Sequence, residues 1–367
     1  MNFDFSDDQK LLADQVKRYL DDNCGMDRVR QVLTGSPRMA QDVWEGLARM
    51  GLLGTAVPES YGGAGAGYAE LCLVAQQLGA HIAPVPFGST VYLVAEALLL
   101  WGSQAQQKYW LPQICAGTVK GALATVESVG QLTPGQIHAE VVNGALCGKK
   151  VVVTDGGVAD LYLVMAKHGD QLSLFLVERA AQVDVLNVDS VDLSRDVAQV
   201  NFQNAPSQLL VAQGWNALEV LQNRAAVLYA FEQLGGAQRA LDMAVAYAQE
   251  RFAFGRAIGS FQAIKHMLAD MFVSLKLAES NCYYAAWALA NNTADLPLAA
   301  ATARVSATQA FQLCAKDNIQ VHGGMGFTWE FDCHLYYRRS NYLALELGSL
   351  SEWEARLVEA LPRVENI

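Results

Sequence analysis

The stretch that decides the fold is ERFAFGRAIGSFQAIKHMLADM, residues 250–271. It lies between two long segments, 216–250 and 259–291, in which apolar residues recur at helical spacing. Helix packing alone does not require an arginine, a phenylalanine and two closely spaced glycines, because glycine weakens the interior of a helix. We therefore expect two long helices joined by a segment, containing Arg251 and Phe254, that was shaped by something other than packing.

Three regions follow from the pattern of apolar residues. Residues 1–116 are predicted to form an N-terminal helical domain, with Ser6 as the N-cap of its first helix. Residues 117–212 change to short, alternating, β-branched runs, which predict a small central β-barrel or sandwich domain. Residues 213–367 return to long helical segments and are predicted to form a C-terminal four-helix bundle. Because helices and strands are segregated along the chain, the predicted fold class is α+β.

Local signals refine this organisation. The pair Asn143-Gly144 predicts a tight turn between strands, and the run Val151–Val153 predicts a core strand. The glycine-rich run YGGAGAG, residues 61–67, follows a helical segment and has no predicted strand before it. Since a dinucleotide-binding loop needs a strand before it and a helix after it, we interpret these glycines as a turn.

Composition excludes several classes of protein. Of the 367 residues 52% are hydrophobic and 17% charged, which is typical of a globular chain. The net charge of −11 argues against nucleic-acid binding, which needs a basic surface. We expect no signal peptide and no membrane span. Seven scattered cysteines without a C-x-x-C pair indicate reduced thiols in a cytoplasmic protein, and the histidine spacing predicts no metal site.

Three motifs, taken together, resemble the acyl-CoA dehydrogenase family over nearly the whole length of the chain. They are PESYGG (58–63), the stretch 250–271, and QVHGGMGFTWEFDCHLYYRR (320–339). The resemblance implies FAD-dependent removal of two hydrogens from an acyl-CoA thioester, with a carboxylate taking the α proton and FAD taking the β hydrogen as hydride. It also implies that an electron-transfer flavoprotein accepts the electrons and that FAD lies across a subunit interface.

The residues that would reach the FAD of a neighbouring subunit are all retained. An arginine can hold a pyrophosphate through charge-assisted hydrogen bonds, and glycine lets the backbone approach a dinucleotide closely. Arg251 could instead be an ordinary surface helix residue, and the two glycines could simply end a helix. The residues that the resemblance assigns to the neighbour's cofactor are Arg251, Phe254, Phe261, Gln320, Gly323 and Gly324.

The second set of FAD contacts, which the family uses to hold the flavin of the same chain, is altered. A loop of the type T-E-P-x-x-G-S-D corresponds to ATVESVGQLTPG, in which Val126 replaces threonine and Ser128 replaces proline, although Glu127 is kept. On the following strand Val152 replaces the aromatic residue that packs on the flavin ring, whereas Thr154 survives as an expected cofactor contact.

The catalytic base is also missing, so the catalytic residue stays unassigned. Leu347 occupies the position where most of the family has a glutamate before a glycine, and Ala225 occupies the position used by a second branch. Glu346 is a weak candidate, because on a helix it would point about 100° away from Leu347. Glu232 is expected to be a paired carboxylate at a helix interface, and His322 to pack and hydrogen-bond.

These losses and retentions favour a base-deficient subunit of a hetero-oligomeric, steroid-CoA type acyl-CoA dehydrogenase, with two copies of each chain. Its expected partners are an acyl-CoA, a companion subunit that supplies the base and the flavin-binding loop, and an electron-transfer flavoprotein. Three alternatives stay open. The first is a self-sufficient homo-oligomer (a dimer or tetramer) in which Glu346 or Glu232 is the base. The second is a non-catalytic interaction protein. The third is another flavoenzyme of the same fold, such as an oxidase.

Overall fold

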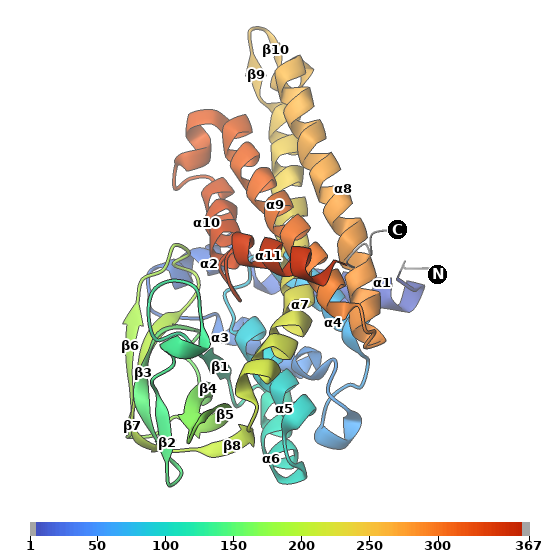
Figure 1. Ribbon diagram of the computed structural model, residues 1–367. Helices are drawn as coiled ribbons and strands as arrows, with labels where there is room; N and C mark the ends of the chain where they lie inside the picture. The colour runs from blue at the N-terminus through green and yellow to red at the C-terminus, as the bar shows by residue number, and fades with distance from the viewer. Residues whose placement is uncertain (1–4, 362–367) are drawn as a thin grey trace. The chain divides into compact units, whose positions relative to one another are not determined.

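The computed structural model describes residues 5–361 and divides them into two compact units. The bundle unit combines the described chain up to Met26 with Tyr68–Ala83 and the residues from Ala226 onward. The sheet unit combines Asp27–Gly67 with Pro84–Ala225. Each unit is described separately, and Figure 1 gives the labels of its helices and strands.

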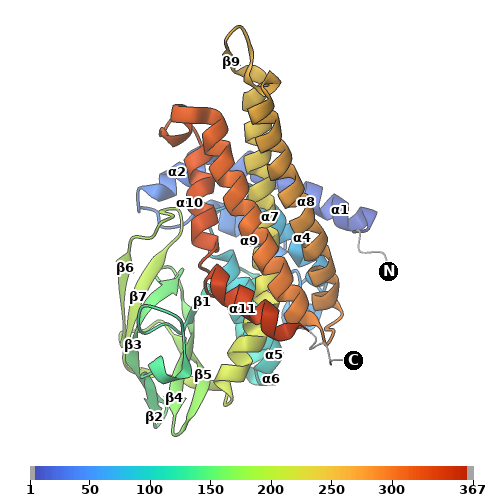
Figure 2. The same cartoon turned by 45° about the horizontal axis from the view of Figure 1, so that its top comes forward.

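The bundle unit is built on long helices, and α8 and α9 run side by side in both Figure 1 and Figure 2. The predicted N-cap is confirmed, since the Ser6 side chain accepts the Gln9 N–H and Gln9 bonds back to the Ser6 backbone. After the third long helix of the C-terminal region the chain forms two shorter helices, α10 and α11, which a turn after Leu343 separates. The helices are α1 Asp7–Asn23, α4 Tyr68–Ala80, α7 Gly214–Glu250, whose second part belongs here, α8 Gln262–Ala290, α9 Leu296–His322, α10 Cys333–Leu343 and α11 Leu350–Ala360.

Two glycines let α4 and α7 touch through their backbones. A Cβ atom on Gly79 would lie 1.8 Å from the carbonyl oxygen of Glu232. A Cβ atom on Gly235 would lie 1.8 Å from the carbonyl oxygen of Gln76. Because no side chain fits at such distances, glycine at both positions fixes how closely these two helices pack.

The sheet unit joins short helices to one mixed sheet of eight strands. Its helices are α2 Met26–Leu33, which begins at the unit boundary, α3 Gln41–Arg49, α5 Glu96–Trp101, preceded by a π-helical segment Gly88–Ala95, α6 Gln104–Cys115 and the first turns of α7. Its strands are β1 Gly121–Ala124, β2 Glu140–Val142, β3 Ala145–Thr154, β4 Leu161–His168, β5 Gln171–Glu178, β6 Val183–Val188, β7 Val197–Pro206 and β8 Gln208–Val211.

The α+β class is confirmed, but the central sheet is not closed. Its strands follow the order β6-β7-β3-β2-β4-β5-β8, and β1 pairs with β4 in parallel. The two end strands, β6 and β8, do not pair with each other, and β8 leads directly toward α7. The expected barrel or sandwich is therefore an open sheet, because alternation along each strand predicts a buried face but not the partner of the last strand.

Two local predictions in the β region have different outcomes. Asn143 and Gly144 adopt φ values of 51° and 78° between β2 and β3, which confirms the tight hairpin turn. The run Val151–Val153 was expected in the core, yet only Val153 is fully buried and Val152 is 50% exposed. A shift of register between Lys150 and Val153 explains this difference, since a bulge resets which side chains face inward.

The glycine-rich run 61–67 is a turn, as predicted. Its first residue, Tyr61, ends the 3₁₀ helix Glu59–Tyr61, and Gly62, Gly65 and Gly67 all have positive φ values. Within residues 5–361 no helix combines the length and the apolar character needed to cross a membrane. Six of the seven cysteines are buried as free thiols, and Cys147 is exposed.

Candidate cofactor-binding site

The segment between α7 and α8 is a short β-hairpin, which we call the arm (residues 251–261). Its strands are β9, Phe252–Ala253, and β10, Arg256–Ala257, and Figure 1 shows it at the free end of the helices. The turn between them is formed by Phe254 and Gly255, with φ values of 53° and 79°. The helix predicted from residue 259 begins instead at Gln262, because the hairpin and one 3₁₀ turn come first.

The arm exposes aromatic rings together with positive charge. Phe254 is 95% exposed and Phe252 is 65% exposed, while Phe261 lies edge-on to Phe254 with ring centroids 6.2 Å apart. The Arg256 guanidinium lies 4.1 Å from the centroid of the Phe261 ring. Within residues 5–361 neither Arg251 nor Arg256 forms an ion pair with a carboxylate. Two uncompensated cations beside exposed rings form a surface suited to an anionic ligand that carries an aromatic group.

The C-terminus of α9 supplies a second exposed element, which we call the glycine turn (residues 320–324). Gln320 is exposed two residues before His322, the last residue of the helix, and its carbonyl accepts the Gly323 N–H. Gly323 has φ 64° and ψ −140°, a conformation that essentially only glycine adopts. Gly324 has no such requirement, and a Cβ atom there would meet nothing within 4 Å. The open space over Gly324 is a place where a group from outside the chain can approach the backbone.

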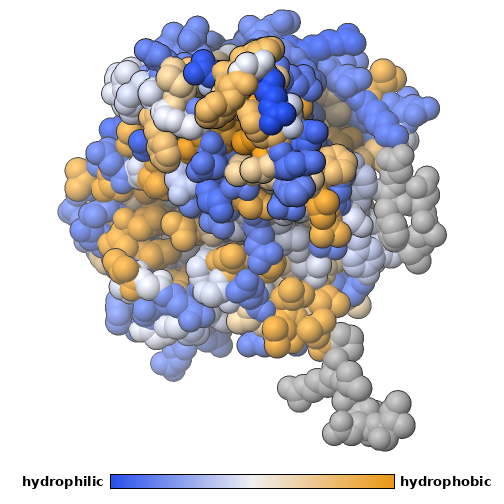
Figure 3. All heavy atoms as spheres, turned by 90° about the horizontal axis from the view of Figure 1, so that it is seen from above, coloured by the Kyte–Doolittle hydropathy of each residue, from blue (hydrophilic) through white to orange (hydrophobic). Residues whose placement is uncertain are grey.

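The bundle brings the arm and the glycine turn to the same end. Tyr247, one turn before Arg251, stacks on His322, which directly precedes Gly323, with ring centroids 4.0 Å apart. Six predicted cofactor residues therefore lie on two neighbouring elements of one unit. Figure 3 looks down on this end and shows apolar side chains at the surface among hydrophilic ones. Arg256 was missed in the sequence, although a second arginine within the same aromatic run was a usable signal.

The altered flavin-holding positions meet in the sheet unit. Val126 and Val152 form an isolated antiparallel bridge, and the Val151 N–H donates to the Val126 carbonyl over 2.9 Å. The structure thus pairs two valines at the positions where the family has a hydroxyl and an aromatic ring. Thr154 ends β3, two residues after Val152 in the sequence, and is partly buried. The valine pair can offer an apolar contact but neither a hydroxyl donor nor a ring for stacking.

Glu127, the retained residue of the altered loop, has a structural role. It accepts the Lys150 ammonium over 2.6 Å and the N–H groups of His138 and Ala139 over 2.7 and 3.0 Å. Burial, only partly offset by Glu127, lowers the pKa of Lys150 to about 8. Burial also opposes ionisation of Glu127, but the Lys150 hydrogen bond and charge outweigh it and hold the pKa of that carboxyl below its usual value. Glu127 thus ties both ends of the 128–137 loop to the sheet.

The position of the family's base lies in a turn and not on a helix. Helix α10 ends at Leu343, and residues 344–347 form a turn in which Leu347 has a φ value of 64°. The expectation of a 100° offset between Glu346 and Leu347 on a helix is therefore wrong. The buried Arg304 guanidinium donates to the carbonyls of Leu343 and Glu346, the latter over 2.7 Å. Burial lowers the pKa of Arg304 to about 10, and the nearby charge of Glu346 opposes that shift.

The other positions considered for a base are buried. Glu232 lies within α7 and its Oε1 is 3.9 Å from a guanidinium nitrogen of Arg339, and both side chains are almost fully buried. This contact agrees with the prediction of a paired carboxylate at a helix interface. Ala225 is completely buried and carries no titratable group. Ala225 therefore cannot accept a proton, and the carboxylate of Glu232 is buried beside a guanidinium.

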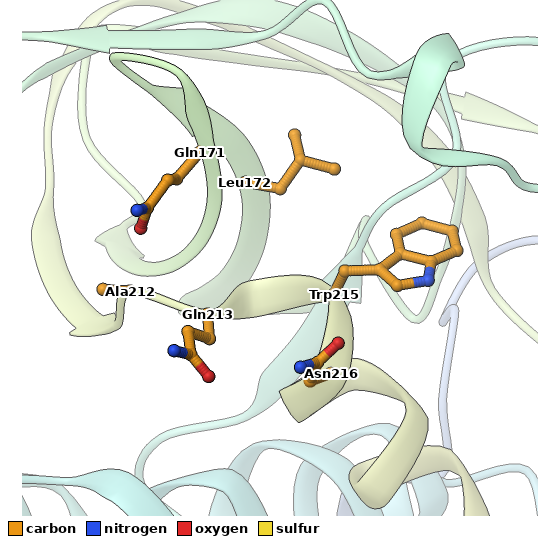
Figure 4. Close-up of a pocket in the computed structure, with 6 residues that line it drawn as sticks. All are labelled: Gln171, Leu172, Ala212, Gln213, Trp215 and Asn216. Atoms are coloured by element: carbon orange, nitrogen blue, oxygen red, sulfur yellow. The ribbon is translucent and has the colours of Figure 1, made fainter.

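A shallow pocket of about 270 Å³ opens in the sheet unit beside the start of α7 (Figure 4). It contains neutral side chains only, so nothing in it can take a proton from a substrate at neutral pH. None of the predicted site residues lines it, and it is therefore distinct from the arm and the glycine turn. Its lining residues are Gln171, Leu172, Ala212, Gln213, Trp215 and Asn216.

Comparison with known proteins identifies the family. Residues 6–118 match the model of the acyl-CoA dehydrogenase N-terminal domain, and residues 212–354 match that of the C-terminal domain. The chain is 30% identical to the acyl-CoA dehydrogenase IpdE2 of Mycobacterium tuberculosis, over 96% of each protein. It is 33% identical to the acyl-CoA dehydrogenase FadE34 of the same organism, over 90% of this chain and 44% of that protein.

Two solved structures have the same fold at somewhat lower identity. One is the ChsE4-ChsE5 complex from Mycobacterium tuberculosis, at 27% identity and a TM-score of 0.91. The match covers 100% of this chain and 100% of the matched chain in that complex. The other is a variant of the Tcur3481-Tcur3483 steroid ACAD, at 29% identity and a TM-score of 0.87, covering 96% of this chain and 97% of that one. With its sequence matches, its fold and its motifs in agreement, the chain belongs to the acyl-CoA dehydrogenase family.

Proposed function

We propose that this chain is the base-deficient subunit of a hetero-oligomeric, FAD-dependent acyl-CoA dehydrogenase. In this proposal the chain extends its arm and glycine turn to an FAD that a companion subunit mainly holds. The companion also supplies the carboxylate that takes the α proton of the acyl-CoA. The observation that carries the proposal is the contrast between a complete outward-facing set in the bundle unit and an altered set in the sheet unit.

The bundle-unit residues fit the diphosphate and adenine end of FAD. Arg251 and Arg256 can pair with a pyrophosphate, because no carboxylate in the described chain forms an ion pair with either guanidinium. Phe254 and Phe261 offer ring faces and edges to an adenine. The open space over Gly324 admits a dinucleotide close to the backbone. These features serve little purpose for packing, since the arm is largely exposed.

The sheet-unit residues do not fit the flavin ring in the same way. Val126 and Val152 leave their bridge without a hydroxyl donor or an aromatic surface. Glu127 is engaged with Lys150 and two backbone N–H groups, so it is not available to a ligand. Thr154 is the one predicted contact that this unit retains. A flavin held by this chain alone would therefore lack several of the family's contacts.

FAD, when bound, accepts the hydride that leaves the β carbon of the substrate. The residues of this chain would contribute binding and orientation: Arg251 and Arg256 would neutralise the diphosphate, and the uncrowded backbone at Gly324 would let the dinucleotide lie close to the chain. Proton removal falls to the companion, because Leu347 has no titratable group. The two candidate carboxylates of this chain are also poorly suited, since Glu232 is buried against Arg339 and Glu346 lies beside the charge of buried Arg304.

Relatives supply the reason for proposing a heteromer and a substrate class. Two of the similar structures carry paired names, ChsE4-ChsE5 and Tcur3481-Tcur3483, and the second is called a steroid ACAD. By analogy we propose a companion of the same family, a bulky steroid-CoA type thioester as the substrate, and an electron-transfer flavoprotein as the acceptor. We place the complex in the cytoplasm on the basis of the composition.

The test is to purify the chain alone and after co-expression with a candidate companion that carries the family's glutamate and flavin loop. Turnover of acyl-CoA is followed with an artificial electron acceptor. The proposal predicts activity only in the co-expressed complex, and loss of that activity when the companion's glutamate is replaced by glutamine. Turnover by the chain alone would refute it and favour the homo-oligomer, with Glu346→Gln as the variant that identifies the base.

A further inference from the structure

Three aromatic rings form a cluster at the end of the bundle that carries the arm and the glycine turn. Tyr247 lies on the last turn of α7, His322 ends α9, and Phe331 follows the 3₁₀ helix Gly323–Phe327. The Tyr247 and His322 rings stack with centroids 4.0 Å apart and an interplanar angle of 23°. Phe331 stands edge-on to both, at 6.1 Å from Tyr247 and 5.7 Å from His322.

The orientation of His322 is fixed on its other side as well. Its Nδ1 lies 2.8 Å from the Asn318 carbonyl, and because a carbonyl can only accept, Nδ1 donates. The side chain is buried, and burial lowers the pKa of His322 below its ordinary value. A neutral ring with one fixed hydrogen bond and a stacking partner has little freedom to rotate, so it makes a firm contact for Tyr247.

The cluster joins the bases of the two elements that carry the predicted cofactor residues. The carbonyl of Tyr247 accepts the N–H of Arg251 over 2.9 Å, so Tyr247 lies directly beneath the start of the arm. His322 belongs to the glycine turn and is bonded covalently to Gly323, whose φ of 64° and ψ of −140° only glycine adopts readily. The stack therefore sets the separation between Arg251 on one element and Gly323 on the other. A dinucleotide that touches both elements depends on that separation.

We propose that Tyr247 and His322 are positioning residues, which hold the arm and the glycine turn at the spacing needed to grip the diphosphate of one dinucleotide. Neither ring has to touch the ligand for this role. The inference rests on the proposed function and deepens it, because it assigns the geometry of the grip to two side chains outside the cofactor contacts.

The test uses the co-expressed complex and measures FAD release by the rise of flavin fluorescence after dilution, together with competition by ADP. Tyr247→Leu removes the ring, and Tyr247→Phe keeps it. As a control, Tyr284→Leu removes a stacked ring near the C-terminal end of α8, far along that helix from the arm. We expect about a tenfold weaker FAD affinity for Tyr247→Leu. Tyr247→Phe and Tyr284→Leu should stay within about twofold of the parent complex. An equally weak Tyr284→Leu variant would overturn the proposal, because general destabilisation would then explain the loss.

Three further variants make the outcome decisive. His322→Gln keeps a donor for the Asn318 carbonyl but lacks a ring, so it tests the stack even if Tyr247→Leu does not fold. The double variant with His322→Gln and Tyr247→Leu should bind FAD no more weakly than either single variant, because both changes remove the same contact, the stack between the two rings. If Arg251→Ala weakens FAD binding and neither ring variant does, the positioning role is wrong and the proposed function stands. If Arg251→Ala also has no effect, the proposed function itself is wrong.

Discussion

Replacing Glu127 by glutamine tests the conclusion that this residue holds a loop and does not serve a ligand. The Lys150 side chain is completely buried, and its ammonium lies 2.6 Å from the Glu127 carboxylate. Without that charge Lys150 should lose its proton in the folded state at neutral pH, because an unpaired buried ammonium is costly. The hydrogen bonds to His138 and Ala139 also weaken, since one oxygen becomes an amide that donates.

The expected loss can be worked out from these contacts. The pKa of Lys150 is about 8 in the folded protein, so at pH 7 the charged pair is more favourable than neutral lysine by somewhat more than about 1 kcal/mol. Loss of one hydrogen bond from a backbone N–H to a charged acceptor adds about 1.5 kcal/mol. The free energy of unfolding of Glu127→Gln should therefore be lower by about 3 kcal/mol at pH 7.

The pH dependence gives this prediction its sign. From pH 7 to about 8, Lys150 is protonated in the folded parent protein but neutral in the folded Glu127→Gln variant. Raising the pH removes that proton, so the advantage of the parent over the variant shrinks to about 1.5 kcal/mol at pH 9. Urea unfolding at pH 7 and pH 9, with the exposed Glu140→Gln as control, measures both values. A deficit that is the same at both pH values, or one below about 1 kcal/mol at pH 7, would refute the reasoning.

Three further predictions concern stability. Leu347→Asn should raise the free energy of unfolding by about 1 kcal/mol, since asparagine tolerates a φ of 64° better than leucine, and a lower melting temperature would contradict this. Gly79→Ala should cost about 3 kcal/mol in thermal unfolding because its Cβ would collide with a carbonyl oxygen, whereas Gly135→Ala, in open space, should change little, and equal effects would count against the helix contact. Burial holds the pKa of His322 below 6.5, so the unfolded chain binds a proton first as the pH falls, and stability should drop below about pH 6.5. His322→Phe should flatten that part of the profile, and an unchanged profile would refute the assignment.

Signals that act over a few residues were readable from the sequence. Ser6 caps its helix because the partner, Gln9, is three residues away. Asn143-Gly144 forms the turn between β2 and β3 because both residues adopt positive φ at low cost. The order of helices, strands and helices also followed from periodicity, because the spacing of apolar residues within an element predicts both its type and its buried face.

Features that depend on distant partners were not readable in the same way. The bulge that exposes Val152 depends on the register against β7, and the open sheet depends on which strands end it. The turn at Leu347 is held by Arg304, which lies far away in the sequence. The arm was recognisable as a site, but its hairpin was not, because Phe254 in a left-handed conformation is unusual for a bulky side chain.

The residues of the site also fall into two groups, those readable from the sequence and those that need the fold. Arg251, Gln320 and the two glycines could be assigned from motifs, and their common position at one end of the bundle followed only from the stack of Tyr247 on His322. The role of Glu127 also needed the fold, since Lys150 is 23 residues away in sequence. Motifs name the residues that meet a ligand, whereas the residues that hold them become visible only through tertiary contacts.

The most direct test of the central claim is the flavin content of this chain purified by itself. Visible absorbance and protein concentration give the number of FAD molecules per chain, after loading with excess FAD and removal of the unbound cofactor. The claim that this chain contributes an arm to a flavin held mainly by a companion predicts almost no bound FAD without that companion, and full occupancy once the two are assembled. One tightly bound FAD per chain in the isolated protein would contradict it.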